Sequence, residues 1–132
     1  MAEQRNQNFK VLVVDDSDFS RKTTVEILER HGFNVVGNAS SAEKGLLLAQ
    51  STRANLYIVD VVMPKVSGIE FAKRLMELRT GVYIIMTSSL DMESVVIESI
   101  SNGAIDFLTK PFTEETLINS VEKIEREFDR DK

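Results

Sequence analysis

The sequence predicts an α/β protein: a doubly wound, five-stranded parallel sheet with helices on both faces. Two observations lead to this fold class. Five short apolar or β-branched segments alternate along the chain with segments in which apolar residues recur at helical spacing. Several of the apolar segments are continuous rather than alternating, which is typical of parallel strands covered on both faces. Successive strand–helix units of this kind favour a single sheet wound in both directions.

The expected strands and helices follow one another without a linker or an internal repeat. The five strands are expected at residues 9–15, 33–38, 55–62, 82–87 and 105–108. The helical spacing is clearest in residues 67–79 and 113–128. Helices are expected to begin at side chains that can cap them, namely Ser17 or Asp18, Ser41, Ser67, Asp91 and Thr113. Gly32 and Gly103 are expected to end two helices. The folded domain is thus expected to span residues 9–129, after a flexible tail of residues 1–8.

Composition argues against several classes of function. The chain of 132 residues is long enough for one domain, and it has no cysteine and one histidine, so disulfides and a zinc site are not expected. The net charge of −5, without any block of Lys or Arg, argues against direct binding to nucleic acid or an anionic membrane. No segment has the pattern of a signal peptide or a membrane span, so the cytosol is the expected compartment. His31 is expected to interact with a helix dipole rather than to transfer phosphate.

Polar side chains stand at or near the carboxyl ends of the expected strands. The fourth strand ends at Thr87 and Ser88. Three carboxylates, one hydroxyl and one ammonium group thus stand at these positions: Asp15, Asp16, Asp60, Thr87 and Lys110. Ligands of a doubly wound sheet bind at the carboxyl ends of its strands, so we expect these side chains to converge. Three carboxylates in a small site need a divalent cation, and oxygen ligands suit Mg²⁺. With a lysine and a hydroxyl beside them, such a site suits phosphoryl oxygens, and one carboxylate can be the nucleophile.

Each of these residues has an ordinary structural explanation when it is considered alone. Asp15 and Asp16 are explained by a strand end followed by a helix cap, and Lys110 by an exposed surface position. Asp60 interrupts the apolar segment YIVDVV and is harder to explain in this way. The coincidence of all these residues at successive strand ends of one fold favours a common site.

Four motifs resemble the receiver domain of two-component response regulators: VLVVDDSDFSR, DVVMPKVSGIEF, IIMTSS and GAIDFLTKPF. The resemblance covers residues 9 to about 129 and implies the flavodoxin-like strand order 2-1-3-4-5. It implies a signalling switch that takes a phosphoryl group from a histidine of a sensor kinase or a phosphotransfer protein. Such a protein is not an enzyme with a substrate of its own, because it promotes only its own phosphorylation and dephosphorylation.

The resemblance also implies the residues of the phosphorylation site. Asp60 is the phosphoacceptor. Mg²⁺ is held by Asp15, Asp16 and Asp60, together with the backbone carbonyl of Val62. Lys110 pairs with a phosphoryl oxygen, and its peptide bond to the following proline is expected to be cis.

The switch residues implied by the resemblance are Thr87, whose hydroxyl moves toward the phosphoryl group, and Phe107, which turns inward with it. The segment from Thr87 to Lys110 is one residue longer than in typical members. If the extra residue does not lie in SSLDM, after the strand, Ser88 takes the role of Thr87. A protein target is expected to bind over the fourth helix, the fifth strand and the fifth helix.

Other functions remain open at this point. A Mg²⁺-dependent phosphohydrolase of the haloacid dehalogenase type would use Asp16 and Asp18 as its D-x-D motif, but it would leave Asp60 unexplained. A nucleotide-binding module would need glycines after the first strand, and DDSDFS has none. A degenerate receiver acting as a scaffold does not fit the intact acidic set. The chain is expected to be either a stand-alone regulator of the chemotaxis or phosphorelay kind or a receiver from a longer regulator.

Overall fold

The computed structural model describes residues 5–131, and in that range five parallel strands form one sheet. The strands are β1 (Lys10–Val14), β2 (Asn34–Ala39), β3 (Leu56–Asp60), β4 (Tyr83–Ser88) and β5 (Asp106–Thr109). Their order across the sheet is β2-β1-β3-β4-β5, and every neighbouring pair is parallel. The predicted fold class and strand order are therefore confirmed.

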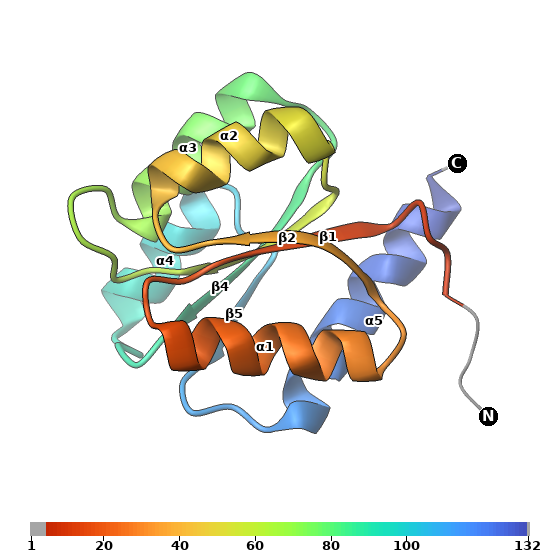
Figure 1. Ribbon diagram of the computed structural model, residues 1–132. Helices are drawn as coiled ribbons and strands as arrows, with labels where there is room; N and C mark the ends of the chain where they lie inside the picture. Colours follow the sequence, from red (N-terminus) through yellow and green to blue (C-terminus); the bar gives the residue numbers. More distant parts are fainter. Residues whose placement is uncertain (1–4, 132) are drawn as a thin grey trace.

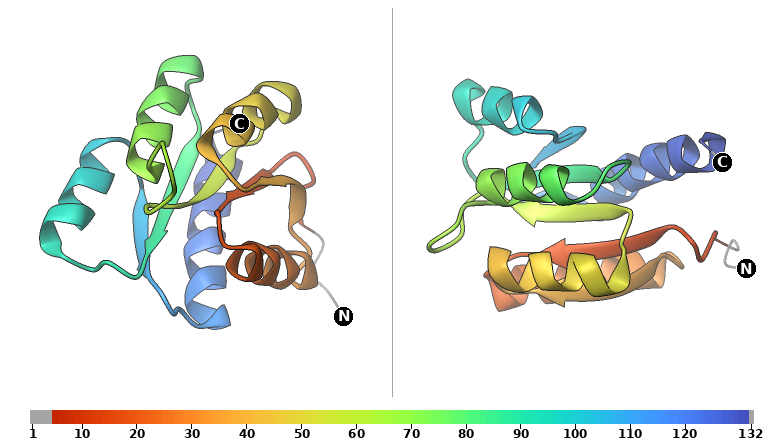
Figure 2. Two further views of the ribbon diagram at one scale, coloured as in Figure 1. Left: turned by 60° about the vertical axis from the view of Figure 1, so that its left-hand side comes forward. Right: turned by 90° about the horizontal axis from the view of Figure 1, so that it is seen from above.

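Helices cover both faces of the sheet (Figure 1). The helices are α1 (Asp18–Arg30), α2 (Ala42–Thr52), α3 (Gly68–Leu78), α4 (Glu93–Ser101) and α5 (Glu114–Arg130). Helices α1 and α5 pack on one face, and α2, α3 and α4 on the other, as two further views show (Figure 2). No helix within residues 5–131 is both long and apolar enough to cross a membrane.

Two hydrophobic clusters lie between the sheet and its helices, one on each face, because alternate residues of each strand point to opposite faces. The cluster under α2 and α3 contains Leu12, Val14, Tyr57, Val59, Ile84 and Met86 of the strands. The cluster under α1 and α5 contains Val11, Val13, Leu56, Ile58 and Ile85. This alternation fixes the face on which each residue after a strand lies, and the site depends on it.

Four of the five helices begin at the side chains predicted to cap them. Ser17, Ser41, Ser67 and Thr113 each accept a hydrogen bond from a backbone N–H in the first turn. The prediction of Asp91 is wrong, because α4 begins one residue later, after Met92, whose side chain makes no capping bond. Gly32 and Gly103 follow the ends of α1 and α4 with φ angles of 82° and 112°, as glycine permits.

The N-terminal segment is held to the domain at least from residue 5 onward. The Arg5 guanidinium donates to the backbone carbonyl of His31 at 3.1 Å and to the carboxylates of Glu122 and Glu125, at 3.0 Å each. It also lies 4.2 Å from the centre of the Phe33 ring. The predicted loose tail of residues 1–8 thus differs from the structure at Arg5, while residues 1–4 lie outside the described range.

Candidate phosphorylation and metal site

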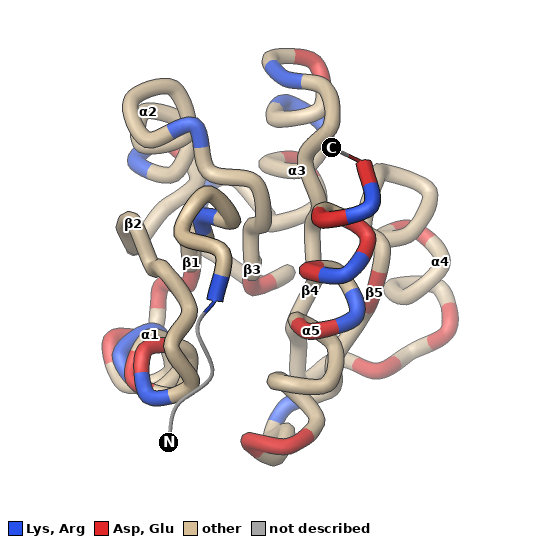
Figure 3. Tube along the Cα trace, turned by 90° about the vertical axis from the view of Figure 1, so that its right-hand side faces the viewer, with Lys and Arg blue, Asp and Glu red and all other residues tan. Residues whose placement is uncertain are grey.

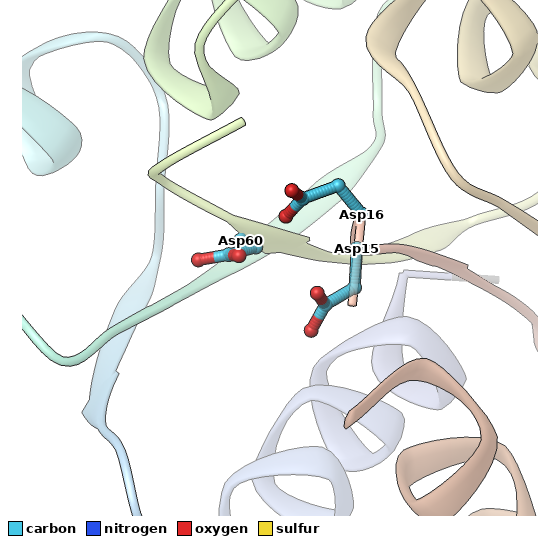
Figure 4. Close-up of side chains that lie close together, drawn as sticks. All are labelled: Asp15, Asp16 and Asp60. Carbon is cyan, nitrogen blue, oxygen red and sulfur yellow. The ribbon is translucent and has the colours of Figure 1, made fainter. Parts of the chain in front are cut away.

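Three aspartates meet at the carboxyl ends of β1 and β3. Asp15 and Asp16 follow β1 directly, and Asp60 is the last residue of β3 (Figure 4). Carboxylate oxygens of the three residues lie within 4.8 Å of one another. Asp15 and Asp60 are buried, whereas Asp16 is exposed, so the cluster opens to solvent on one side. The convergence predicted from the strand ends is therefore present.

Lys110 supplies the positive charge of this cluster. It follows β5, and its Nζ donates to Oδ2 of Asp15 at 2.8 Å and lies 3.6 Å from Oδ2 of Asp60. Its backbone N–H donates to the carbonyl of Ser88 at 2.8 Å, which ties the loop after β5 to the end of β4. The Lys110–Pro111 peptide bond is cis, as predicted. A single ammonium group thus contacts two of the three carboxylates.

The protonation of Asp60 depends on its surroundings. Burial raises the pKa of the Asp60 carboxyl to about 6; the charges of Asp15 and Asp16 act in the same direction, and Lys110 opposes them. The backbone N–H of Val62 donates to Oδ1 of Asp60 at 3.3 Å and also opposes the shift. A cation beside the cluster would favour the ionised form, because it would offset both the desolvation and the like charges.

The turn between β1 and α1 holds Asp15 in place through contacts that were not predicted from the sequence. The hydroxyl of Ser20 donates to Oδ2 of Asp15 at 2.7 Å, and the backbone N–H of Ser17 donates to Oδ1 at 2.9 Å. Nη1 of Arg21 donates to the backbone carbonyl of Asp15 at 2.8 Å, and its Nε donates to Asn38 of β2 at 3.0 Å. Ser20 and Arg21 stand three and four residues after the capping Ser17, on the same side of the first helical turn, and that spacing is the signal available in the sequence.

The two candidate hydroxyls of β4 lie on opposite faces of the sheet. Thr87 pairs with Asp60 and Leu108 and shares their face, and its hydroxyl lies 3.5 Å from the carbonyl of Val59, back along β3. Ser88 lies one residue nearer the carboxyl edge, on the face of Met86 and Phe107. Its hydroxyl accepts the N–H of Leu90 at 2.9 Å. The structure therefore places Phe107, which is half-buried against the cluster that Val95 of α4 also contacts, on the side of Ser88 and not of Thr87.

The donor set of the cluster fits Mg²⁺. The cluster offers three carboxylates, one of them solvent-facing, which suits a hard cation that keeps several waters. Asp60 is buried beside two like charges, so binding of such an ion should stabilise the folded protein. Val62 directly follows the buried end of β3 and is itself exposed, and its carbonyl as a ligand stays a prediction.

Comparison with known proteins identifies the family. Residues 11–122 match the response regulator receiver domain, and the chain belongs to this family. It is 32% identical over 114 residues to the chemotaxis protein CheY of Bacillus subtilis, an alignment that covers 86% of this chain and 95% of that protein. It is 29% identical to CheY of Thermotoga maritima over 117 residues, which are 89% of this chain and 98% of that protein. The predicted resemblance is confirmed, and the acidic cluster agrees with the phosphoacceptor and Mg²⁺ site of a receiver.

Solved structures agree in fold. A chain of the CheX–CheY–BeF₃–Mg²⁺ complex from Borrelia burgdorferi superposes with a TM-score of 0.86 at 28% identity, covering 91% of this chain and 94% of that one. A CheY-like receiver domain protein from Methanospirillum hungatei gives a TM-score of 0.87 at 25% identity, covering 98% and 100%. The likeness extends over nearly the whole length of both chains.

Magnesium should stabilise the protein more at high pH than at low pH. Without metal, the raised pKa of Asp60 contributes stability that is present below its ordinary value of 3.8 and is lost as the pH rises through about 6. Because Mg²⁺ binds the carboxylate, an Mg²⁺ concentration ten times its Kd should add about 1.4 kcal/mol well above pH 6 and less below it. Thermal melts with and without Mg²⁺ on both sides of pH 6 measure the difference.

The Asp60→Asn variant is the control for this experiment. It should lose the pH dependence in this range and most of the shift with Mg²⁺, because the amide does not ionise and is a weaker ligand. An equal Mg²⁺ shift in the variant, or a larger shift in the native protein below pH 6 than above it, would contradict the assignment of Asp60 to the metal site.

Proposed function

We propose that this receiver accepts a phosphoryl group on Asp60 from a phosphohistidine of a kinase or phosphotransfer protein, and that the modification changes the affinity for a protein target. The observation that supports this most is the meeting of Asp15, Asp16 and Asp60 with Lys110 at one edge of the sheet, in a chain that belongs to the receiver family. The proposal places the reaction in the cytosol. It treats the chain as catalysing only its own phosphorylation and dephosphorylation.

The transfer is a substitution at phosphorus with Asp60 as the nucleophile. A carboxylate oxygen of Asp60 forms the new P–O bond, and the P–N bond to the donor imidazole breaks. The imidazole nitrogen keeps the electron pair of the broken bond. If the other ring nitrogen already carries a proton, the imidazole leaves as a neutral group; if it does not, the departing nitrogen takes up one proton. Asp60 must be ionised to attack; burial, which raises its pKa, disfavours this form, and a cation held by the cluster would favour it.

Lys110 and the other two carboxylates have separate tasks in this proposal. Lys110, 3.6 Å from Asp60 and bonded to Asp15, is placed to exchange that ion pair for a bond to a phosphoryl oxygen. Asp15, Asp16 and Asp60 would hold Mg²⁺, which supplies positive charge for the phosphoryl oxygens. When Lys110 binds the phosphoryl oxygen instead of Asp15, the contacts of Ser20 and Arg21 still hold Asp15 in its orientation.

Ser88 rather than Thr87 is the proposed switch hydroxyl. Ser88 lies nearer the carboxyl edge and on the face of Phe107, so its movement toward a phosphoryl oxygen would open space on the side where Phe107 packs. Thr87 lies on the opposite face, where its buried hydroxyl is next to the Val59 carbonyl. Phe107 has no hydroxyl to bond in solvent, so its response is steric.

Alanine substitutions at the two positions should separate their roles. Ser88→Ala should keep phosphorylation of Asp60 but remove the response at Phe107 and α4, because no hydroxyl is left to bind the phosphoryl oxygen. Thr87→Ala should keep the response and lose about 1 kcal/mol of stability through the missing buried methyl group. Amide NMR spectra recorded with and without beryllofluoride, which stands in for the phosphoryl group, measure the response. If Thr87→Ala loses the response and Ser88→Ala keeps it, Thr87 is the switch hydroxyl and the assignment of Ser88 is wrong.

The proposed output face is formed by α4, β5 and α5. Phe107 of β5 and Val95 of α4 pack against the same hydrophobic cluster, and Ser88 precedes the loop that leads into α4, so a change at the site is expected to reach this face. Protein targets recognised by such a switch need a surface that differs between the two states.

A further inference from the structure

One carboxylate oxygen of the acidic cluster has two side-chain donors. Oδ2 of Asp15 accepts hydrogen bonds from the ammonium group of Lys110 at 2.8 Å and from the hydroxyl of Ser20 at 2.7 Å. Among the contacts described for residues 5–131, Oδ1 accepts only the backbone N–H of Ser17, at 2.9 Å. The Asp15 side chain is 5% exposed, so water has little access to these oxygens and the protein must supply their hydrogen bonds.

The hydroxyl of Ser20 is not needed to cap the helix in which it stands. Ser20 is the third residue after the cap Ser17, and it is its backbone N–H that donates to the Ser17 hydroxyl, at 3.2 Å. The matching residue of α5 is Thr116, whose hydroxyl lies 2.9 Å from that of the cap Thr113. In α1 the hydroxyl at this position donates to Asp15 instead. The contact with the acidic cluster is therefore additional to the cap and can be removed without removing it.

Transfer of Lys110 to a phosphoryl oxygen would take one of these two donors away from Asp15. A buried carboxylate oxygen that loses its last donor is destabilised, because its desolvation is no longer compensated. The Ser20 hydroxyl would leave Oδ2 with one charge-assisted hydrogen bond after Lys110 has moved. Two other contacts of Asp15 do not supply this bond, because Arg21 donates to the backbone carbonyl and the N–H of Ser17 donates to the other carboxylate oxygen.

We propose that Ser20 is a positioning residue for phosphorylation. Its hydroxyl holds Oδ2 of Asp15 when Lys110 leaves, and this bond makes the transfer of Lys110 to the phosphoryl oxygen easier. Ser20 acts through Asp15 and Lys110 rather than on the phosphoryl group. The inference rests on the proposed function, because it concerns the movement of Lys110 that this function includes. It goes beyond the orientation of Asp15, because orientation is needed equally while Lys110 stays in place.

Titrations with two ligands test this role. At saturating Mg²⁺, Ser20→Ala should bind beryllofluoride about 10-fold more weakly than the native protein, because this ligand requires Lys110 to leave Asp15. The affinity for Mg²⁺ alone should change by less than about 2-fold, because Asp15 keeps a free acceptor position for a cation while Lys110 stays in place. Amide NMR spectra measure both affinities.

The two affinities separate the possible roles of Ser20. An equal loss for both ligands would mean that Ser20 only orients Asp15, and the proposal would be wrong. If the native protein does not bind beryllofluoride, the proposed function fails and this inference with it. If the native protein binds it and Ser20→Ala binds it equally well, only the role of Ser20 is overturned.

Two further variants serve as controls. Ser20→Thr keeps the hydroxyl and should restore the native affinity for beryllofluoride. Ser94→Ala removes a hydroxyl from the first turn of α4 and should leave both affinities unchanged. Ser94 is exposed, and its helix carries acidic positions and no basic ones, so this variant removes a hydroxyl from a helix without a lysine (Figure 3). An equal loss of beryllofluoride affinity in Ser94→Ala would show that the effect does not depend on the contact with Asp15, and the proposal would be wrong.

A double-mutant cycle tests the link between Ser20 and Lys110 without any ligand. Lys110→Ala imitates the departure of the lysine. In the Ser20→Ala background it should lower the folding equilibrium constant about 5-fold more than in the native background, because Oδ2 of Asp15 then has neither side-chain donor. Urea unfolding of the native protein, the two single variants and the double variant, all without Mg²⁺, measures the difference. Additive effects of the two substitutions would mean that the hydroxyl does not compensate for the missing lysine, and the proposal would be overturned.

Discussion

Replacing Asp60 by Asn is expected to abolish covalent phosphorylation. The native protein, incubated with acetyl phosphate and Mg²⁺, should gain the mass of one phosphoryl group, and the adduct should be stable in acid and labile in alkali, as an acyl phosphate is. The side-chain amide of the variant is a very poor nucleophile. Asp15 is engaged by Lys110 and Ser20, and Asp16 serves the proposed metal site, so neither is expected to replace Asp60. Intact-protein mass spectrometry measures the adduct directly.

The control for this experiment is Asp91→Asn, which makes the same chemical change at an exposed residue outside the three-carboxylate cluster. It should be phosphorylated like the native protein. An adduct that persists in Asp60→Asn and disappears in Asp16→Asn would instead favour the phosphohydrolase mechanism, in which the nucleophile follows the first strand. Rapid turnover of a generic phosphate ester by the native chain would point the same way.

Replacing Gly68 by Ala is expected to be the most destabilising single methyl addition near the site. A Cβ at Gly68 would lie 2.2 Å from the backbone oxygen of Asp60 and 2.8 Å from its carbonyl carbon. These are backbone atoms at the end of β3, so relief requires a shift of either the strand or the start of α3. The expected loss is about 3 kcal/mol or more, or roughly 10 °C in melting temperature. Thermal or urea unfolding measures it.

Gly37→Ala is a matched control, because a Cβ there meets only side-chain carbons, the nearest at 3.5 Å. It should change stability by less than about 1 kcal/mol. Phosphorylation of the Gly68→Ala variant at a temperature where it is folded should also be slower, because the added methyl group displaces the backbone of Asp60. A Gly68→Ala protein as stable as Gly37→Ala would show that the close packing of α3 on β3 is not required.

The fold and the acidic cluster were predictable because they depend on patterns that span many residues. Several independent signals predict the same topology, and no single position decides it. They are the continuous apolar strands, the caps Ser41 and Ser67, and the glycines after α1 and α4. In a parallel sheet the carboxyl ends of neighbouring strands share an edge, so the sequence positions of Asp15 and Asp60 were enough to bring them together.

Features that depend on a shift of one residue were not predictable. Thr87 and Ser88 are adjacent and both end β4, and only the strand register shows which of them shares a face with Phe107. The start of α4 was predicted one residue early at Asp91, because a helix that begins without a capping side chain gives no signal in the sequence. The contacts of Arg5 join residues far apart in the chain, and a polar segment before the first strand has no periodicity to reveal them.

The contacts of Arg5 show that the packed domain begins before the segment that matches the family. The family match begins at residue 11, yet Arg5 fills a position between the end of α1, the Phe33 ring and α5. Burial raises the pKa of Glu125, and Arg5 is the cation that opposes this shift. A version of the domain that begins at residue 11 would lack Arg5, so Glu125 would lose this counter-charge. The residues before β1 from Arg5 onward are therefore part of the packed domain.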